Sequence, residues 1–140
     1  MLVGFVGDDL RDTNLRLYAD ADFVGCKATM RSTSGVFACA HGASTMYPLA
    51  ARCIKQTCVS HSTPEAEIVA GNAALNVIGL PFLDALDVLA GYRYPLDFRG
   101  DNQTMISVCT TGKNPTTITL SRTHGVCVAW LHETFTNGPE

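Results

Sequence analysis

The chain has 140 residues, of which 46% are hydrophobic and 16% are charged, and its formal net charge is −3. This composition is typical of a single globular domain spanning residues 1–140, and it excludes an intrinsically disordered chain. The acidic balance argues against a strong free-standing nucleic-acid-binding protein, although it permits an enzyme that grips phosphate locally. The sequence also predicts no membrane span and no signal peptide.

The cysteines indicate a reducing compartment. None forms a C-x-x-C pair, and several lie in apolar stretches; the six are Cys26, Cys39, Cys53, Cys58, Cys109 and Cys127. A structural zinc site would need tighter spacing. We therefore expect reduced core residues of an intracellular protein.

The chain opens with a segment of uncertain order and a clear strand. Residues 1–13 predict either a strand end or a flexible leader. Residues 15–20 alternate apolar and polar side chains, which is the period-two pattern of a strand. This strand ends on Asp20, so the carboxylate is expected at the C-terminal edge of a sheet.

Two further strands complete a predicted antiparallel meander. A polar loop that includes residues 31–34 comes first, and residues 35–40 then predict the second strand. Residues 44–50 predict a weaker third strand, in which Pro48 favours an edge position.

The clearest helix start is Thr63-Pro64-Glu65. It offers a hydroxyl N-cap, a proline at the first helical position and an acid in the positive first turn. The helix continues over residues 66–79, whose small residues would let it approach a sheet closely. Pro81 must kink or restart it. A second apolar segment over residues 80–89 then ends with Gly91 as its C-cap.

The last third of the chain predicts one strand and two helices. Residues 95–101 predict a strand that ends on Asp101, and residues 102–108 predict a short helix directly after it. Residues 110–121 predict a loop, and residues 125–133 favour a final helix packed on the sheet over a strand. This order of elements indicates an α/β fold in which helices cover a mixed sheet.

Three carboxylates are expected to converge. Asp20 and Asp101 each end a predicted strand, and Glu67 falls in the first turn of a predicted helix. Active sites of open α/β sheets form at this edge, and hard divalent cations prefer oxygen ligands, so the set predicts a metal site. Each acid also has an ordinary alternative. Asp20 could be a solvated side chain, Glu67 a helix-dipole partner (a role that fits Glu65 better) and Asp101 an N-cap.

Local sequences sharpen this pattern. They are Tyr18-Ala19-Asp20-Ala21-Asp22-Phe23-Val24-Gly25-Cys26, Arg31-Ser32-Thr33-Ser34-Gly35, Pro64-Glu65-Ala66-Glu67 and Gly100-Asp101-Asn102-Gln103, followed by Lys113-Asn114-Pro115 and Arg122-Thr123-His124. In this order, and over about residues 15–133, the chain resembles the reverse transcriptase-associated ribonuclease H domain of copia-type LTR retrotransposon polyproteins.

The resemblance implies a ribonuclease H-like fold, with a five-stranded mixed sheet whose first three strands are antiparallel and which helices flank. It implies an endonuclease that cleaves the RNA strand of RNA/DNA hybrids during reverse transcription. Asp20, Glu67 and Asp101 would be its catalytic residues and the ligands of two Mg²⁺ ions, with Mn²⁺ as an alternative. Two such ions can activate a water and stabilise the departing 3′ oxygen of a phosphodiester.

The chain departs from the family where a fourth acidic ligand usually follows the histidine of the C-terminal motif. Here His124 is followed by Gly125 and Val126. The candidates for this position are His124, which is nearest in sequence, His132 and Glu133. If none reaches the site, one metal ion would be held weakly. A second hypothesis is therefore a catalytically silent structural or nucleic-acid-binding module of a retrotransposon polyprotein.

Substrate contacts are expected from small polar residues. Asn102, Gln103 and Ser32 could read the wide minor groove of a hybrid and its 2′-hydroxyls. Phosphate contacts by basic residues are also considered, although a solvated charge is favoured for each of Arg31, Lys55 and Arg99. Since the chain is acidic, we expect the reverse transcriptase domain of the same polyprotein to hold the RNA/DNA hybrid. The resemblance implies an intracellular location, in cytoplasmic virus-like particles, and no membrane partner.

Overall fold

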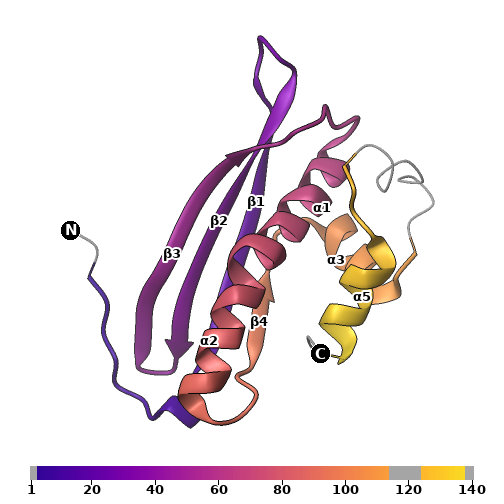
Figure 1. Cartoon of the computed structure of the whole chain (residues 1–140). Coiled ribbons are helices and arrows are strands. Elements are labelled where there is room, and N and C mark those ends of the chain that lie inside the picture. The colour runs from indigo at the N-terminus through magenta and orange to yellow at the C-terminus, as the bar shows by residue number, and fades with distance from the viewer. Residues whose placement is uncertain (1–2, 114–123, 138–140) are drawn as a thin grey trace.

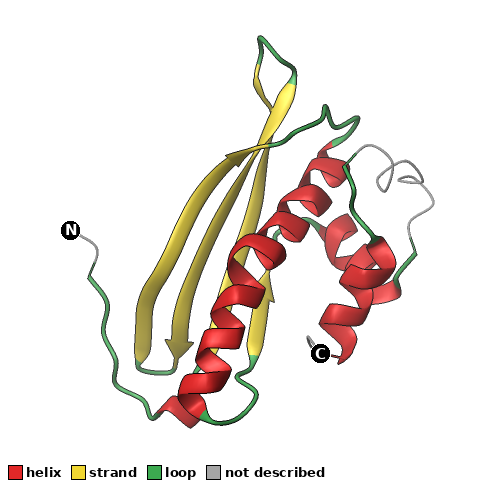
Figure 2. Ribbon diagram, in the orientation of Figure 1, coloured by secondary structure: helices red, strands yellow, loops and turns green. Residues whose placement is uncertain are grey.

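The structure, a computed structural model, describes residues 3–113 and 124–137. Its strands are β1 (Asn14–Cys26), β2 (Arg31–Gly42), β3 (Thr45–Lys55) and β4 (Leu96–Arg99). Its helical segments are η1 (Leu10–Asp12), α1 (Thr63–Ala74), η2 (Leu75–Gly79), α2 (Leu80–Ala90), α3 (Gln103–Thr111) and α5 (Val128–Asn137). Figures 1 and 2 show α1 and α2 running along the sheet, with α3 and α5 beyond β4.

The strands form one mixed sheet in the order β3-β2-β1-β4. β1 pairs antiparallel with β2, β2 pairs antiparallel with β3, and β1 pairs parallel with β4. The predicted α/β class and the antiparallel meander are confirmed, and Pro48 lies on the edge strand β3 as expected. Within the described ranges the sheet has four strands, where the family resemblance implied five.

The predicted alternation of the first strand is confirmed. Leu15 and Leu17 have no exposed area, and Ala19 is buried with them. They join one core with small residues of α1 such as Ala70, because small side chains let the helix approach closely. At Gly79 a Cβ atom would lie 2.9 Å from Leu17 Cδ2, so the absence of a side chain there lets the helix pack closely on the sheet.

The predicted loop over residues 31–34 is wrong, because these residues belong to β2. β1 and β2 continue pairing beyond the predicted strand ends, with Ala21 opposite Ser34. Ser34 is buried and its hydroxyl accepts a hydrogen bond from Gln56 Nε2 (3.1 Å). Because buried partners form hydrogen bonds with these polar side chains, a polar segment whose sequence predicts a loop can form a strand.

The helix prediction holds in outline and is wrong at its first residue. The N-cap is Ser62, whose hydroxyl accepts a hydrogen bond from Glu65 N (3.3 Å), and Thr63 is the first helical residue. α-Helical geometry resumes at Leu80 after the π-helical segment η2, with Pro81 in the first turn of α2, so the predicted irregularity near Pro81 is present and the helix continues through it. Gly91 is the C-cap, with a left-handed φ of 74°.

The continuous helix Thr63–Ala90 corrects another expectation. By length and composition it is apolar enough to cross a membrane, although no such segment was predicted. The first half of this helix packs against β1 and β2, so packing in the protein core accounts for its apolar composition. Its second half exposes Val88 and Leu89.

Two other predictions change at the ends of the chain. Residues 4–13 are not a free leader, because Phe5 pairs with Met46 through two backbone hydrogen bonds of 3.0 and 2.9 Å. Thr110 and Thr111 belong to α3, and residues 114–121 of the predicted loop lie outside the described residues. The final helix is confirmed as α5, which packs on α3 and reaches β4 through Phe135.

The cysteines are free, as predicted, but they are mostly not core residues. Cys39 is buried, whereas Cys53 and Cys127 are exposed and Cys26, Cys58 and Cys109 are partly buried. The apolar neighbours of Cys127 misled the prediction, because that residue lies just before α5 and faces solvent.

Candidate metal centre

The structure brings the three predicted carboxylates together. Asp20, Glu67 and Asp101 each offer an oxygen atom, and these oxygens all lie within 4.8 Å of one another. Asp20 lies in β1, and Asp101 lies two residues beyond the end of β4. Since β1 and β4 are parallel, both carboxylates reach the same edge of the sheet. Glu67 joins them from the N-terminal half of α1.

The three side chains differ in exposure. Asp20 and Asp101 are exposed, whereas Glu67 has only 5% of its surface accessible. The Ala21 amide donates a hydrogen bond to Asp20 Oδ1 (2.9 Å), which helps to orient this carboxylate. The cluster therefore opens to solvent on the aspartate side and is closed on the helix side.

The packing of the cluster changes the pKa of Glu67. Burial, and to a smaller extent the negative charges of Asp20 and Asp101, together raise the pKa of its carboxyl group from 4.5 to about 7. A hydrogen bond involving the backbone of Ala21 lowers this pKa and only partly compensates. Three oxygen donors that repel one another, one of them buried, fit a hard divalent cation.

The alternative role of Asp101 as a helix cap is excluded by the structure. The N-cap of α3 is Asn102, whose Oδ1 accepts a hydrogen bond from Met105 N (3.0 Å). Gly100 leaves room for the end of the Met105 side chain, which a Cβ atom at that position would meet. Because Asn102 caps α3, the Asp101 carboxylate is free to join the cluster.

The residue that interacts with the N-terminal end of α1 is Glu65 rather than Glu67. Glu65 Oε2 accepts a hydrogen bond from His61 N (2.6 Å) and lies 3.3 Å from His61 Nδ1. This carboxylate therefore interacts with the residues that precede α1, close to the positive end of the helix. Glu67, two residues later, faces the two aspartates.

None of the three candidates for the fourth position joins the carboxylate cluster in the described part of the chain. His124 is buried and its Nε2 lies 3.4 Å from Glu65 Oε1, at ion-pair distance but without hydrogen-bond geometry. His132 Nδ1 lies 2.9 Å from the carbonyl oxygen of Cys109, and Glu133 is exposed on α5. The Glu65–His124 contact was missed, because no sequence spacing connects those residues.

The predicted substrate contacts differ in accessibility. Ser32 has no exposed area, and its hydroxyl accepts a hydrogen bond from Val24 N (3.1 Å), so its predicted role as a substrate contact is wrong for this structure. Asn102 is half-buried and caps α3, while Gln103 is exposed at the start of that helix. Of these three residues, Gln103 is the one that solvent reaches freely.

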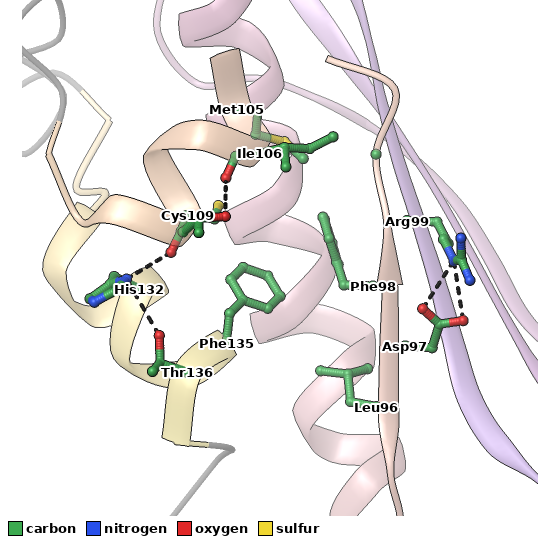
Figure 3. A pocket seen from close by; sticks show the side chains of 12 residues that line it. Leu96, Asp97, Phe98, Arg99, Met105, Ile106, Cys109, His132, Phe135 and Thr136 are labelled. Atoms are coloured by element: carbon green, nitrogen blue, oxygen red, sulfur yellow. Dashed lines mark hydrogen bonds and ion pairs between the residues drawn. The ribbon is translucent and has the colours of Figure 1, made fainter. Parts of the chain in front are cut away.

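A groove of about 630 Å³ (Figure 3) has Gly100, the neighbour of Asp101, among its lining residues. β4, α3 and α5 line it, with Phe98, His132 and Phe135 among its side chains. None of the three clustered carboxylates lines this groove. We assign the chemistry to the carboxylate cluster, because the arginine that lines the groove, Arg99, is paired with Asp97 (3.0 Å) and is not free to bind a phosphodiester.

Comparisons of the chain with protein-family models, with curated proteins and with solved structures gave no match.

Proposed function

We propose that this chain is a metal-dependent ribonuclease H domain that cleaves the RNA strand of RNA/DNA hybrids during retrotransposon reverse transcription. The observation that carries the proposal is the convergence of Asp20, Glu67 and Asp101 at the carboxyl edge of β1 and β4. These residues come from three separate motifs of the resemblance. Their convergence supports a common role that none of the motifs supports alone.

The three carboxylates would hold the divalent cations, Mg²⁺ or Mn²⁺. When bound, such cations activate water and stabilise the charge that develops on a departing 3′ oxygen. Asp20 and Asp101 are exposed and can meet substrate and solvent, whereas the buried Glu67 fixes the closed side of the site. Because the pKa of Glu67 is raised to about 7, this carboxyl group must lose its proton before it can serve as a ligand.

The proposal includes the finer fold, a ribonuclease H-like sheet with a fifth strand. β4 pairs with β1 along one edge, and among the described strands nothing pairs with its other edge. That edge borders the groove between α3 and α5. A free strand edge beside a groove is compatible with a further strand.

A second candidate function is a catalytically silent module of the same polyprotein. The placement of His124, His132 and Glu133 favours it, because none of these side chains joins the three carboxylates. The raised pKa of Glu67 supports the catalytic proposal instead, because burial and, to a smaller extent, repulsion by Asp20 and Asp101 disfavour its charge, and a bound cation would offset both. In either case we propose the reverse transcriptase domain as the partner that holds the hybrid, in cytoplasmic virus-like particles.

The test is cleavage of a hybrid whose RNA strand is end-labelled, with Mg²⁺ and separately with Mn²⁺. Wild type is compared with Asp20→Asn and Asp101→Asn, and with Asp84→Asn, an exposed aspartate of α2, as the matched control. We expect metal-dependent cutting of the RNA strand by wild type and Asp84→Asn, and a loss of at least about 100-fold in both cluster variants. Folded wild type that cuts with neither metal would favour the silent module.

A further inference from the structure

The β1–β2 hairpin extends past the carboxylate cluster (Figure 1). Asp20 marks the cluster on β1, and pairing with β2 continues to Cys26, which lies opposite Arg31. Six residues of strand at ~3.3 Å each give this hairpin arm, residues 22–31, a length of at most ~20 Å beyond the cluster. This distance corresponds to roughly six base-pair steps of a duplex.

Basic side chains gather at the tip of the arm. Lys27 and Arg31 are exposed there, and Lys55, at the end of β3, reaches the tip because its Nζ lies 3.1 Å from Cys26 Sγ. In the described ranges no carboxylate forms an ion pair with any of these three side chains. The arm itself carries one acid, Asp22, whose carboxylate lies over Gly25.

The contrast with other arginines is informative. Arg16 and Arg99 both pair with Asp97, at 2.8 and 3.0 Å, so their charges are compensated within the sheet. At the tip, Lys27, Arg31 and Lys55 outnumber Asp22, the one carboxylate of the arm, on a chain whose net charge is −3. Such a local patch attracts a polyanion although the whole domain does not.

The arm is held in a defined conformation. The β1–β2 register shifts between Asp22 and Cys26, and within this irregularity Val24 has a φ of 55°. Left-handed backbone is unusual for a β-branched residue and persists only where surrounding structure holds it. Here the Val24 amide donates to the hydroxyl of the fully buried Ser32. Ser32 thus anchors the arm rather than touching substrate.

We infer that the hairpin arm, together with Lys55, binds the phosphate backbone of the RNA/DNA hybrid several nucleotides away from the carboxylate cluster. This inference rests on the proposed function, because it takes the same duplex as the ligand. A preformed basic arm loses little conformational entropy on binding, and phosphate contacts position a duplex without reading its sequence.

The experiment measures binding without cleavage. A fluorescein-labelled 20-base-pair hybrid is titrated in EDTA by anisotropy, over a series of salt concentrations. Lys27→Gln/Arg31→Gln is compared with Arg11→Gln/Arg93→Gln, whose exposed side chains lie at the start of β1 and before β4, at the opposite end of the sheet. Both pairs remove two positive charges, so they match in net charge.

We expect the arm variant to bind at least about tenfold more weakly at 0.1 M salt, with a salt slope shallower by about 2. Lys55→Gln should add a further loss, and the control pair should bind like wild type. Equal binding by the arm and control variants would overturn the inference. The inference would also be overturned if the arm variant bound the hybrid like wild type but bound vesicles containing phosphatidylserine more weakly.

A second readout is local to the tip. Thr29 and then Lys55 lower the pKa of the Cys26 thiol to about 6, so iodoacetamide should alkylate Cys26 at pH 7. Mass spectrometry should show that the hybrid protects Cys26 but leaves the exposed Cys53 and Cys127 reactive. Hybrid bound with no protection of Cys26 would overturn the inference. If wild type binds the hybrid through the arm but does not cleave it, the proposed nuclease function fails and the inference about the arm stands.

Discussion

The charge of Glu67 should govern the stability of the metal-free protein. Its pKa rises from the ordinary 4.5 to about 7 on folding, because the carboxyl group is buried beside Asp20 and Asp101. A raised folded-state pKa contributes stability that is present below the unfolded value and is lost as pH rises through the folded value. The unfolding free energy should therefore fall between pH 4.5 and 7 and level off above pH 7.

The size of this effect follows from the pKa change. At about 1.4 kcal/mol per pH unit, the full fall is roughly 3 kcal/mol, and solvent access from the aspartate side reduces it to roughly 2 kcal/mol. Glu67→Gln removes the charge but keeps the shape and an acceptor oxygen. The variant should therefore be more stable than wild type in EDTA at pH 8, by on the order of 2 kcal/mol, and should match it at pH 4.5.

The assay is urea unfolding followed by circular dichroism at several pH values, with EDTA present. Glu133→Gln, an exposed glutamate of α5, is the matched control and should follow wild type at every pH. Titrating groups away from the cluster act equally on all variants, so the difference between Glu67→Gln and wild type reports Glu67 together with its coupling to Asp20 and Asp101. A difference that stays constant from pH 4.5 to 8 would refute the reasoning.

Three other outcomes are expected. Because Glu67 must deprotonate to bind, Mn²⁺ should bind wild type more tightly as pH rises toward 7. Binding should release about one proton at about pH 6 and below and about half a proton at pH 7, measured by calorimetry in buffers of different ionisation enthalpy. Ser32→Ala should cost about 1–2 kcal/mol of unfolding free energy and speed amide exchange at Val24, whose hydrogen-bond acceptor is removed. Gly91→Ala should cost about 1 kcal/mol in urea unfolding, with Gly91→Asn milder, because a φ of 74° strains a Cβ although nothing lies within 4 Å of it.

Several features follow from local sequence alone. The alternation of Leu15 and Leu17 with polar neighbours predicts a strand with one buried face, since side chains of a strand alternate between faces. Gly91 ends its helix as predicted, because few residues tolerate a left-handed φ. The convergence of Asp20, Glu67 and Asp101 is also predicted, although Asp20 lies within β1 rather than at its end and Glu67 lies just beyond the first turn of α1; the parallel pairing of β1 with β4 brings the two aspartates together.

Other features depend on contacts between distant residues, which local patterns do not contain. Ser32 reads as an exposed loop residue, yet it is buried because it accepts the hydrogen bond of Val24. His124 reads as a ligand, yet it lies against Glu65, far away in sequence. Burial of a polar group is favourable only when a partner is in place. The sequence by itself therefore determined the α/β class, the main strands and helices and the three acids that gather, while tertiary structure decided that residues 31–34 extend β2 and which partners the buried polar side chains have.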